Sequence, residues 1–149
     1  MDVLRERLPA FREAFAGEAR RTLASRELCP VLKVDLEVAL GDMTRELHRF
    51  LKYVGPHGMS NPRPLFLSRG VELAGPGRLV GRDHLKVRLR QDGTVMDGIG
   101  FGLARRISLE ALASGPLDVV FQLDENEYRG VRTLQARIKD IRPGEGAFR

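Results

Sequence analysis

The second half of the chain, from Pro64 onward, contains five short segments typical of β-strands, each bounded by turn residues. A stretch of helical character separates the first three segments from the last two. The segments are "LFLSRGVELAG" (65–75), "HLKVRLR" (84–90), "TVMDGIGFG" (94–102), "LDVVFQL" (117–123) and "VRTLQARIKDI" (131–141). Closely spaced short strands predict a sandwich or a barrel rather than alternating β and α units.

The connections between these segments narrow the choice of fold. Asp92-Gly93 predicts a tight hairpin between the second and third strands, because this dipeptide favours the left-handed backbone of two-residue turns. The stretch "DENEYRG" (124–130) is predicted to close a hairpin between the fourth and fifth strands. Ser108 is a suitable N-cap for a short helix that ends at Gly115. Three strands, a helix and two strands is the order of an OB-fold, a five-stranded, partly open barrel.

Three glycines alternate along the third segment, at positions 98, 100 and 102. They would weaken a flat strand, but they permit a sharp bend at a barrel corner. A nucleotide-binding loop is the alternative interpretation of "GIGFG". We favour the bend, because the spacing of a phosphate-binding fingerprint and a surrounding βαβ unit are both missing.

The first half of the chain is predicted to form a helix, a strand and a second helix. Apolar residues at helical spacing over 8–23 predict a packed amphipathic helix. Between Pro30 and Gly41 the period changes to two, which predicts a half-buried strand. Asp42 is predicted to cap a second helix that ends before Gly55. One strand needs partners in a sheet, so residues 1–54 are predicted either to dock onto the barrel or to be the end of a larger domain. The fold class is therefore α+β.

Composition restricts the class of protein. The 149 residues carry interspersed charges with a net charge of +5, and they contain no apolar run long enough to span a membrane. The start "MDVLRERL" is too charged for a signal peptide, so we expect a cytoplasmic protein with no membrane partner. Cys29 is the single cysteine, which excludes an intramolecular disulfide and a Cys-based zinc site. We expect it to be a small buried residue at a helix end.

The sequence offers no self-sufficient active site. The histidines at positions 48, 57 and 84 lack the paired spacing of metal ligands, and no carboxylate cluster resembles a two-metal centre. Nothing resembles the "G-x-S-x-G" motif of a serine nucleophile. His48 on the polar side of a helix and His57 in a turn are both predicted to be solvated. We therefore expect no catalytic residue, no metal ligand and no cofactor in this chain.

Cationic side chains are predicted to gather on the outside of the barrel. In "HLKVRLR", Leu85, Val87 and Leu89 point to one face, so their neighbours line the other. The candidate nucleic-acid-binding residues of this kind are Lys86, Arg88 and Arg90 in the second strand and Arg137 and Lys139 in the last. Outward cations on one small barrel can form a groove for a phosphate backbone. The alternative is an ordinary solvated face whose Lys and Arg residues protect strand edges.

Aromatic side chains that could stack on bases are scarce, because the chain has no Trp. The two candidates for stacking are Phe101 and Tyr128. Tyr128 lies in a polar hairpin and is predicted to be exposed, so it is the preferred candidate. Phe101 is predicted to belong to the core.

The segment "HGMSNPRPLFLSRGV" (57–71) joins the two halves, and it resembles the Gly-Met-Gly-Asn-Pro-x-Pro segment that precedes the OB domain in RecJ-like single-strand-specific exonucleases. "MDGIGFG" resembles that family's Asp-x-Ile-Gly-Phe-Gly strand, and "FQLDENEYRGVRTLQARIKDIRP" is similar to its closing hairpin. "RLPAFREAF" resembles the helix that follows the family's Gly-Gly-His motif. The sequence departs from the family at Ser60, where Gly is common, and at His57, where an aromatic residue is frequent.

This resemblance implies a domain organisation. Residues 1–54 would be the tail of a DHHA1-type domain, residues 55–64 a Pro/Gly connector, residues 65–143 the OB domain and residues 144–149 a tail. The complete family members hold Mn²⁺ or Mg²⁺ with Asp-His-His motifs and associated carboxylates, none of which is in this chain. The chain would then be the inactive, C-terminal part of a 5′→3′ exonuclease.

The resemblance also implies partners. Single-stranded DNA would bind to Lys86, Arg88, Arg90, Arg137 and Lys139 through its phosphates and to Tyr128 through a base. Further partners would be the upstream catalytic domains and a single-strand-binding protein or other proteins of DNA repair and recombination. The alternative is a non-catalytic scaffold or protein-interaction module of a repair or replication complex.

Overall fold

A computed structural model describes residues 4–24 and 31–144 of the chain, which divides into two compact units, Met1–Leu32 and Lys33–Arg149. Cys29 lies outside the described residues, and so does most of the tail predicted for residues 144–149. Among the helices of the described ranges, none is long and apolar enough to cross a membrane.

The first unit consists of a single turn, η1 (Arg5–Arg7), and the helix α1 (Leu8–Leu23). This confirms the predicted helix, which has Pro9 in its first turn. Phe11 and Phe15 stack on the helix surface with their ring centroids 5.9 Å apart. No described residue of α1 is buried, however, so the predicted packing of its apolar stripe is wrong for this unit. The reason is that η1 is the one other described element of the unit and is too short to cover the stripe.

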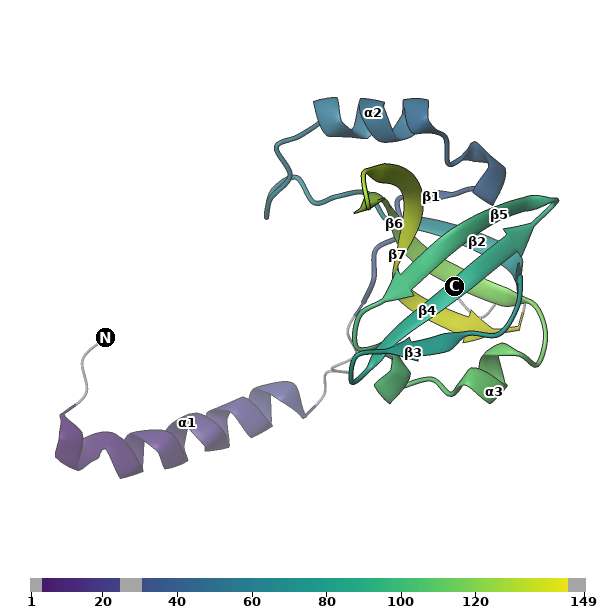
Figure 1. Cartoon of the computed structure of the whole chain (residues 1–149). Helices are drawn as coiled ribbons and strands as arrows, with labels where there is room; N and C mark the ends of the chain where they lie inside the picture. Colours follow the sequence, from purple (N-terminus) through teal and green to yellow (C-terminus); the bar gives the residue numbers. More distant parts are fainter. Residues whose placement is uncertain (1–3, 25–30, 145–149) are drawn as a thin grey trace. The chain divides into compact units, whose positions relative to one another are not determined.

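The second unit is built around a ring of five strands (Figure 1). The ring runs β2, β6, β7, β5, β4 and back to β2, which confirms the predicted OB-type α+β fold. All neighbours in the ring are antiparallel except β5 and β7. The five strands are β2 (Phe66–Leu73), β4 (His84–Gln91), β5 (Thr94–Gly100), β6 (Leu117–Tyr128) and β7 (Val131–Pro143).

Two short strands extend the ring beyond the five that the sequence predicts. β1 (Leu36–Glu37) pairs with β2 in parallel, and β3 (Arg78–Val80) pairs with β4 in antiparallel orientation. β1 lies within the segment predicted as a half-buried strand, but it is far shorter, and Leu36 is exposed. The strand is short because backbone pairing with the β2 region is limited to a few bonds, such as Val38 N–H to the Leu67 carbonyl at 2.9 Å.

Both hairpin turns consist of two residues with positive φ. Asp92 (φ 47°) and Gly93 (φ 82°) connect β4 and β5, as predicted. Arg129 (φ 51°) and Gly130 (φ 78°) connect β6 and β7, so most of the stretch predicted as a connection is strand. Cross-strand pairing, including the ion pair between Arg132 Nε and Glu127 Oε2 at 2.8 Å, carries the ladder to the tip.

The barrel core contains the inward side chains of all five strands. Phe121 is fully buried and lies 6.0 Å from the Phe66 ring, measured between centroids. A Cβ atom on Gly98 would lie 2.8 Å from Cδ1 of Ile138 and 3.1 Å from Cγ2 of Val87, so a larger residue here would displace side chains of the barrel core. β5 ends at Gly100, and Gly102 (φ 71°) starts the turn that leads into η3 (Leu103–Arg105).

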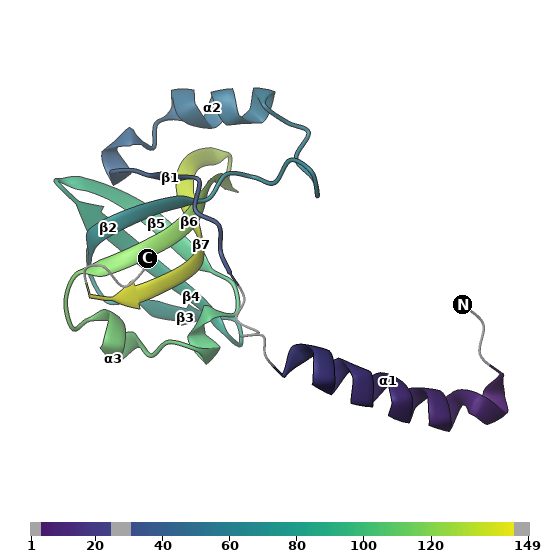
Figure 2. The same ribbon diagram turned by 180° about the vertical axis from the view of Figure 1, so that it is seen from behind.

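Helices cover the two ends of the barrel (Figures 1 and 2). At one end lies α3 (Leu109–Leu112), whose predicted cap is confirmed, because Ser108 Oγ accepts a hydrogen bond from the Ala111 N–H at 3.1 Å. At the other end lies α2 (Arg45–Tyr53), preceded by η2 (Leu40–Asp42). Thr44 caps α2, and Asp42 instead accepts a hydrogen bond from the Ala39 N–H. The predicted cap was therefore two residues too early.

The helix α2 lies beside the β6–β7 hairpin in both ribbon views. Arg45 Nη2 donates to the Arg132 carbonyl at 2.7 Å, and Lys52 Nζ lies 3.3 Å from Glu125 Oε2. This docking buries His48, which is only 8% exposed, so its predicted solvation is wrong. Residues 33–54 thus belong to the same compact unit as the barrel.

Candidate nucleic-acid interface

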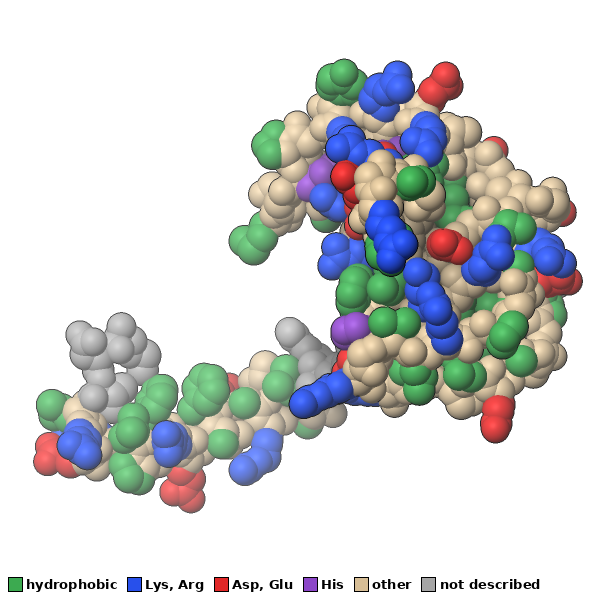
Figure 3. All heavy atoms as spheres, in the orientation of Figure 1, with side chains coloured by type: hydrophobic (Ala, Val, Ile, Leu, Met, Phe, Trp, Pro, Cys, Tyr) green, Lys and Arg blue, Asp and Glu red, His purple; other side chains and the backbone are tan. Residues whose placement is uncertain are grey.

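Lys and Arg side chains gather over β4, β5 and the β6–β7 hairpin and continue toward α2 (Figure 3). The strand register explains this arrangement. Lys86 on β4 lies opposite Ile99 on β5, and Ile99 lies opposite Arg137 on β7. The predicted cations of β4 and β7 therefore share one outward surface, with β5 between them. We call Lys86, Arg88, Arg90, Arg137 and Lys139 the cationic face.

Arg88 and Arg90 lie further along β4 and are both exposed. Arg88 Nε is 3.5 Å from Asp97 Oδ1 on the neighbouring strand. Arg90 lies opposite Val95 on β5 and opposite Glu72 on β2, near the closure of the ring. An ion pair between exposed side chains contributes little to stability, so Arg88 can exchange Asp97 for a phosphate at low cost.

Phe101 lies on the surface beside the cationic face, so its predicted place in the core is wrong. It is 51% exposed, because β5 ends at Gly100 and the chain turns away from the barrel at Gly102. The His84 ring meets it edge to face with centroids 5.1 Å apart, and the Arg137 guanidinium lies 5.3 Å from its ring centroid. The alternation of outward residues along β5 reaches Phe101 and could have predicted this exposure.

Tyr128 is 65% exposed at the tip of the β6–β7 hairpin, where the Arg129 guanidinium lies 5.3 Å from its ring centroid. It pairs with Val131, six positions along β7 from Arg137. At a rise of about 3.3 Å per residue, the separation along the strand is about 20 Å. The predicted exposure of Tyr128 is therefore right, but the fold does not bring it together with the cationic face.

Lys139 and Arg137 lie near a third cation, Arg63, which no pattern in the sequence indicates. Arg63 Nη1 is 3.6 Å from Asp124 Oδ1, and Arg137 Nη1 is 4.0 Å from Asp124 Oδ2. Burial of Lys139 and the positive charges of Arg137 and Arg63 lower its pKa, although Asp124 acts in the opposite direction. Arg63 is isolated between two prolines in the sequence, so only the fold reveals its neighbours.

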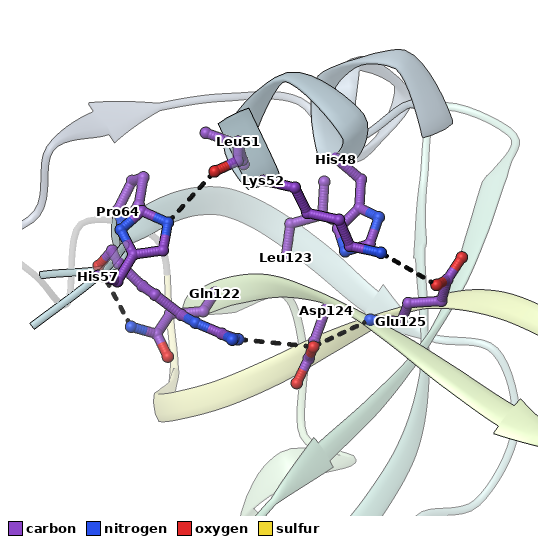
Figure 4. A pocket seen from close by; sticks show the side chains of 10 residues that line it. His48, Leu51, Lys52, His57, Pro64, Gln122, Leu123, Asp124 and Glu125 are labelled. Carbon is purple, nitrogen blue, oxygen red and sulfur yellow. Dashed lines mark hydrogen bonds and ion pairs between the residues drawn. The ribbon is translucent and has the colours of Figure 1, made fainter. Parts of the chain in front are cut away.

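A pocket of about 190 Å³ lies between α2, the connector and β6 (Figure 4). His57 is half-buried there and its Nε2 lies 3.2 Å from the Leu51 carbonyl oxygen, so its predicted solvation is wrong. Burial raises the pKa of Glu125, but the hydrogen bond and charge of Lys52, together with the charges of His48 and Arg132, lower it overall. The lining residues are His48, Leu51, Lys52, His57, Arg63, Pro64, Gln122, Leu123, Asp124 and Glu125.

The described residues do not fit a Mn²⁺ or Mg²⁺ centre. Within residues 4–24 and 31–144, no group of three or more His, Cys, Asp or Glu side chains is arranged to hold a metal ion. The carboxylates nearest the cationic face, Asp97 and Asp124, lie instead against arginine side chains.

These features define the class of protein. A five-stranded ring whose second and third strands (β4 and β5) present an outward polar face has the architecture of OB-fold domains that bind oligonucleotides or oligosaccharides. The family model described as the RecJ OB domain matches residues 34–140. The chain therefore belongs to the RecJ OB domain family, which confirms the resemblance seen in the sequence.

Similarity to individual RecJ proteins extends over nearly the whole chain. The single-stranded-DNA-specific exonuclease RecJ of Dickeya dadantii (strain 3937) is 30% identical over 145 residues, which are 96% of this chain and 25% of that protein. Two crystal structures of RecJ from Thermus thermophilus have the same fold. The Mn²⁺ complex matches with a TM-score of 0.68 and 24% identity over 97% of this chain and 20% of that one. The Mg²⁺ complex matches with a TM-score of 0.64 and 26% identity, over 96% and 21%.

The chain thus spans a quarter or less of the length of the RecJ proteins that it matches. The family match begins at residue 34, near the start of the second compact unit. It therefore includes β1 and α2 together with the five-stranded ring.

Proposed function

We propose that this chain binds single-stranded DNA as the C-terminal part of a RecJ-like 5′→3′ exonuclease of DNA repair and recombination. The observation that carries the proposal is the row of Lys86, Ile99 and Arg137 across β4, β5 and β7, with exposed Phe101 under the Arg137 guanidinium. Cations follow a phosphate backbone, and an aromatic ring beside them gives a base a surface on which to stack.

Each side chain has a proposed role. The five residues of the cationic face contact phosphates, and they act without sequence preference because phosphates carry no base identity. Phe101 replaces Tyr128 as the main stacking residue, since the fold places it beside Arg137. Tyr128 remains a candidate for a second contact at the hairpin tip.

The hydrolytic step is assigned to other parts of the complete enzyme. The two Thermus thermophilus structures are complexes of RecJ with Mn²⁺ and Mg²⁺. Such ions supply activated water and charge stabilisation for phosphodiester hydrolysis. This chain would hold and orient the strand. The tail of a DHHA1-type domain, expected over residues 1–54, would be limited to residues 1–32, because the second compact unit and the family match both take in residues 34–54. Residues 55–64 would then be a connector inside this unit, and residues 65–143 would form the barrel of the OB domain. The protein would be located in the cytoplasm, and a single-strand-binding protein would be among its partners.

The test is the binding of a fluorescently labelled oligo-dT, followed by anisotropy at several salt concentrations. The variant Lys86→Ala/Arg88→Ala/Arg90→Ala is expected to bind more weakly. Each lost phosphate contact should reduce the slope of log affinity against log salt by about 0.7. A variant with the same loss of charge in the first unit, Arg5→Ala/Arg12→Ala/Arg20→Ala, serves as the control and should keep most of the affinity. Equal affinity of wild type and the β4 variant would refute the proposed interface.

The second candidate function is a scaffold or protein-interaction module. It is favoured by the apolar surface of α1, where Phe15 is 66% exposed beside Phe11. This function predicts that the folded chain binds no oligo-dT even at low salt. Binding of oligo-dT that duplex DNA fails to displace would instead support the single-strand function.

A further inference from the structure

Two arginines share one carboxylate where the connector meets the barrel, and a lysine lies near them. The two oxygens of Asp124 lie near different arginines, Oδ1 at 3.6 Å from Arg63 and Oδ2 at 4.0 Å from Arg137. Lys139 lies two positions after Arg137 on β7, and the charges of Arg137, Arg63 and Asp124 all act on its pKa, which places it beside this group. A register shift opposite Val120 and Phe121 leaves Lys139 without a paired residue on β6.

The charges in this cluster are not balanced. Asp124 is one carboxylate among three cations, and both of its contacts are long for an ion pair. The lowered pKa of Lys139 has burial as its first cause and the charges of Arg137 and Arg63 as the next ones. A second anion would therefore be favoured at this position.

We propose that Arg63, Arg137 and Lys139 bind a backbone phosphate of single-stranded DNA, and that Asp124 occupies the two arginines in the absence of DNA. This inference rests on the proposed function. Arg137 connects the two sites, because it belongs to the cationic face and its guanidinium also lies over Phe101. A strand that follows the cationic face past Phe101 reaches Arg137, and it then meets Arg63 at the edge of the barrel.

The connector is built to hold Arg63 in place. Pro62 and Pro64 fix the backbone on both sides of it, and proline also keeps the preceding residue extended. The Arg63 carbonyl accepts a hydrogen bond from Gln122 Nε2 at 3.2 Å, which ties this residue to β6. The guanidinium therefore extends from a restrained segment, and its planar donors suit phosphate geometry.

The test compares two single variants with opposite expected effects on oligo-dT affinity. Arg63→Ala removes a charged phosphate contact, so we expect about tenfold weaker binding and a salt slope smaller by about 0.7. Asp124→Asn removes the competing carboxylate at nearly constant size, so we expect binding about two- to fivefold tighter.

Matched controls separate this site from general electrostatics. Arg20→Ala on α1 and Glu110→Gln on α3 remove the same charges elsewhere and should leave affinity nearly unchanged. In the Arg63→Ala/Asp124→Asn double variant, the gain from Asp124→Asn should be smaller than in the wild-type background, because one of its two arginines is gone. Thermal unfolding of each variant checks that it is folded.

The outcomes distinguish this inference from the proposed function. If wild type binds oligo-dT but Arg63→Ala binds equally well, or if Asp124→Asn weakens binding, the phosphate site is refuted while the cationic face stands. If the wild-type chain binds no oligo-dT, the proposed function is refuted, and the phosphate site that rests on it is refuted as well. The loss in Arg63→Ala should be equal for oligonucleotides with a 5′-hydroxyl and a 5′-phosphate. A loss confined to the phosphorylated oligonucleotide would overturn the assignment to a backbone phosphate.

Discussion

The two faces of β4 differ in burial and charge: one is apolar and buried, and the other is cationic and largely exposed. Leu85, Val87 and Leu89 point into the barrel and are at most 2% exposed. Arg88 and Arg90, which alternate with them along the strand, point outward and are exposed. The inner face determines whether the ring closes, whereas the outer face makes almost no contribution to the core. Stability and DNA binding should therefore respond to different residues of the same strand.

The largest expected effect tests the inner face. Leu89 is fully buried, so Leu89→Ala leaves a cavity in the core. We expect the free energy of unfolding to fall by about 2–5 kcal/mol. Urea denaturation followed by circular dichroism measures this change. Arg90→Ala, the next residue along the strand, is the control and should change stability by at most about 0.5 kcal/mol. Comparable losses in both variants would remove the distinction between the faces.

The second-largest expected effect is on DNA binding, and it concerns Phe101 on the outer surface of the barrel. Phe101→Ala is expected to weaken oligo-dT binding by about 1–3 kcal/mol, because a base loses its stacking surface. Phe101→Trp should retain binding, since it keeps an aromatic surface, and Tyr128→Ala should have a smaller effect than Phe101→Ala. Anisotropy measures affinity, and thermal unfolding measures stability. Phe101 would be a core residue after all if Phe101→Ala unfolded the barrel and left the affinity of the folded fraction unchanged.

The same comparison shows what sequence alone can predict. Along β4, strand geometry alone decides which side chains point inward, so the pattern predicts Leu85 and Lys86 correctly. The same rule continues through β5 to Phe101, where the apparent hydrophobicity of the residue led to a wrong prediction. The hairpin turn at Asp92-Gly93 was also predictable, because two residues determine it.

Features that depend on contacts between distant segments were not predictable. His48 has a polar helical neighbourhood in sequence, yet α2 docks on a hairpin more than seventy residues later, as the Lys52–Glu125 pair shows. Arg63 belongs to a turn-rich connector, and its relation to Asp124 exists only after the barrel has formed. Both features depend on tertiary contacts, which the local periodicity of the sequence does not predict.

The smallest expected effect extends the comparison from β4 to α2, whose inward face holds an ionisable residue. Burial of His48, and next the charge of Lys52, lower its pKa below 6.5, although Glu125 and Asp124 on β6 act in the opposite direction and Arg63 of the connector adds to the lowering. The unfolded chain therefore takes up a proton at higher pH than the folded one.

Stability should be constant above the ordinary histidine pKa of 6.5 and should decrease as the pH falls through it. Urea midpoints measured from pH 8 to pH 5 test this dependence in wild type and in His48→Gln, which lacks the titrating group. The variant should lose part of the wild-type decrease. Glu125, whose lowered pKa costs stability only as the pH falls below 4.5, does not interfere in this range. An identical pH dependence in both proteins would mean that docking of α2 leaves His48 as free to ionise as an outward residue of β4.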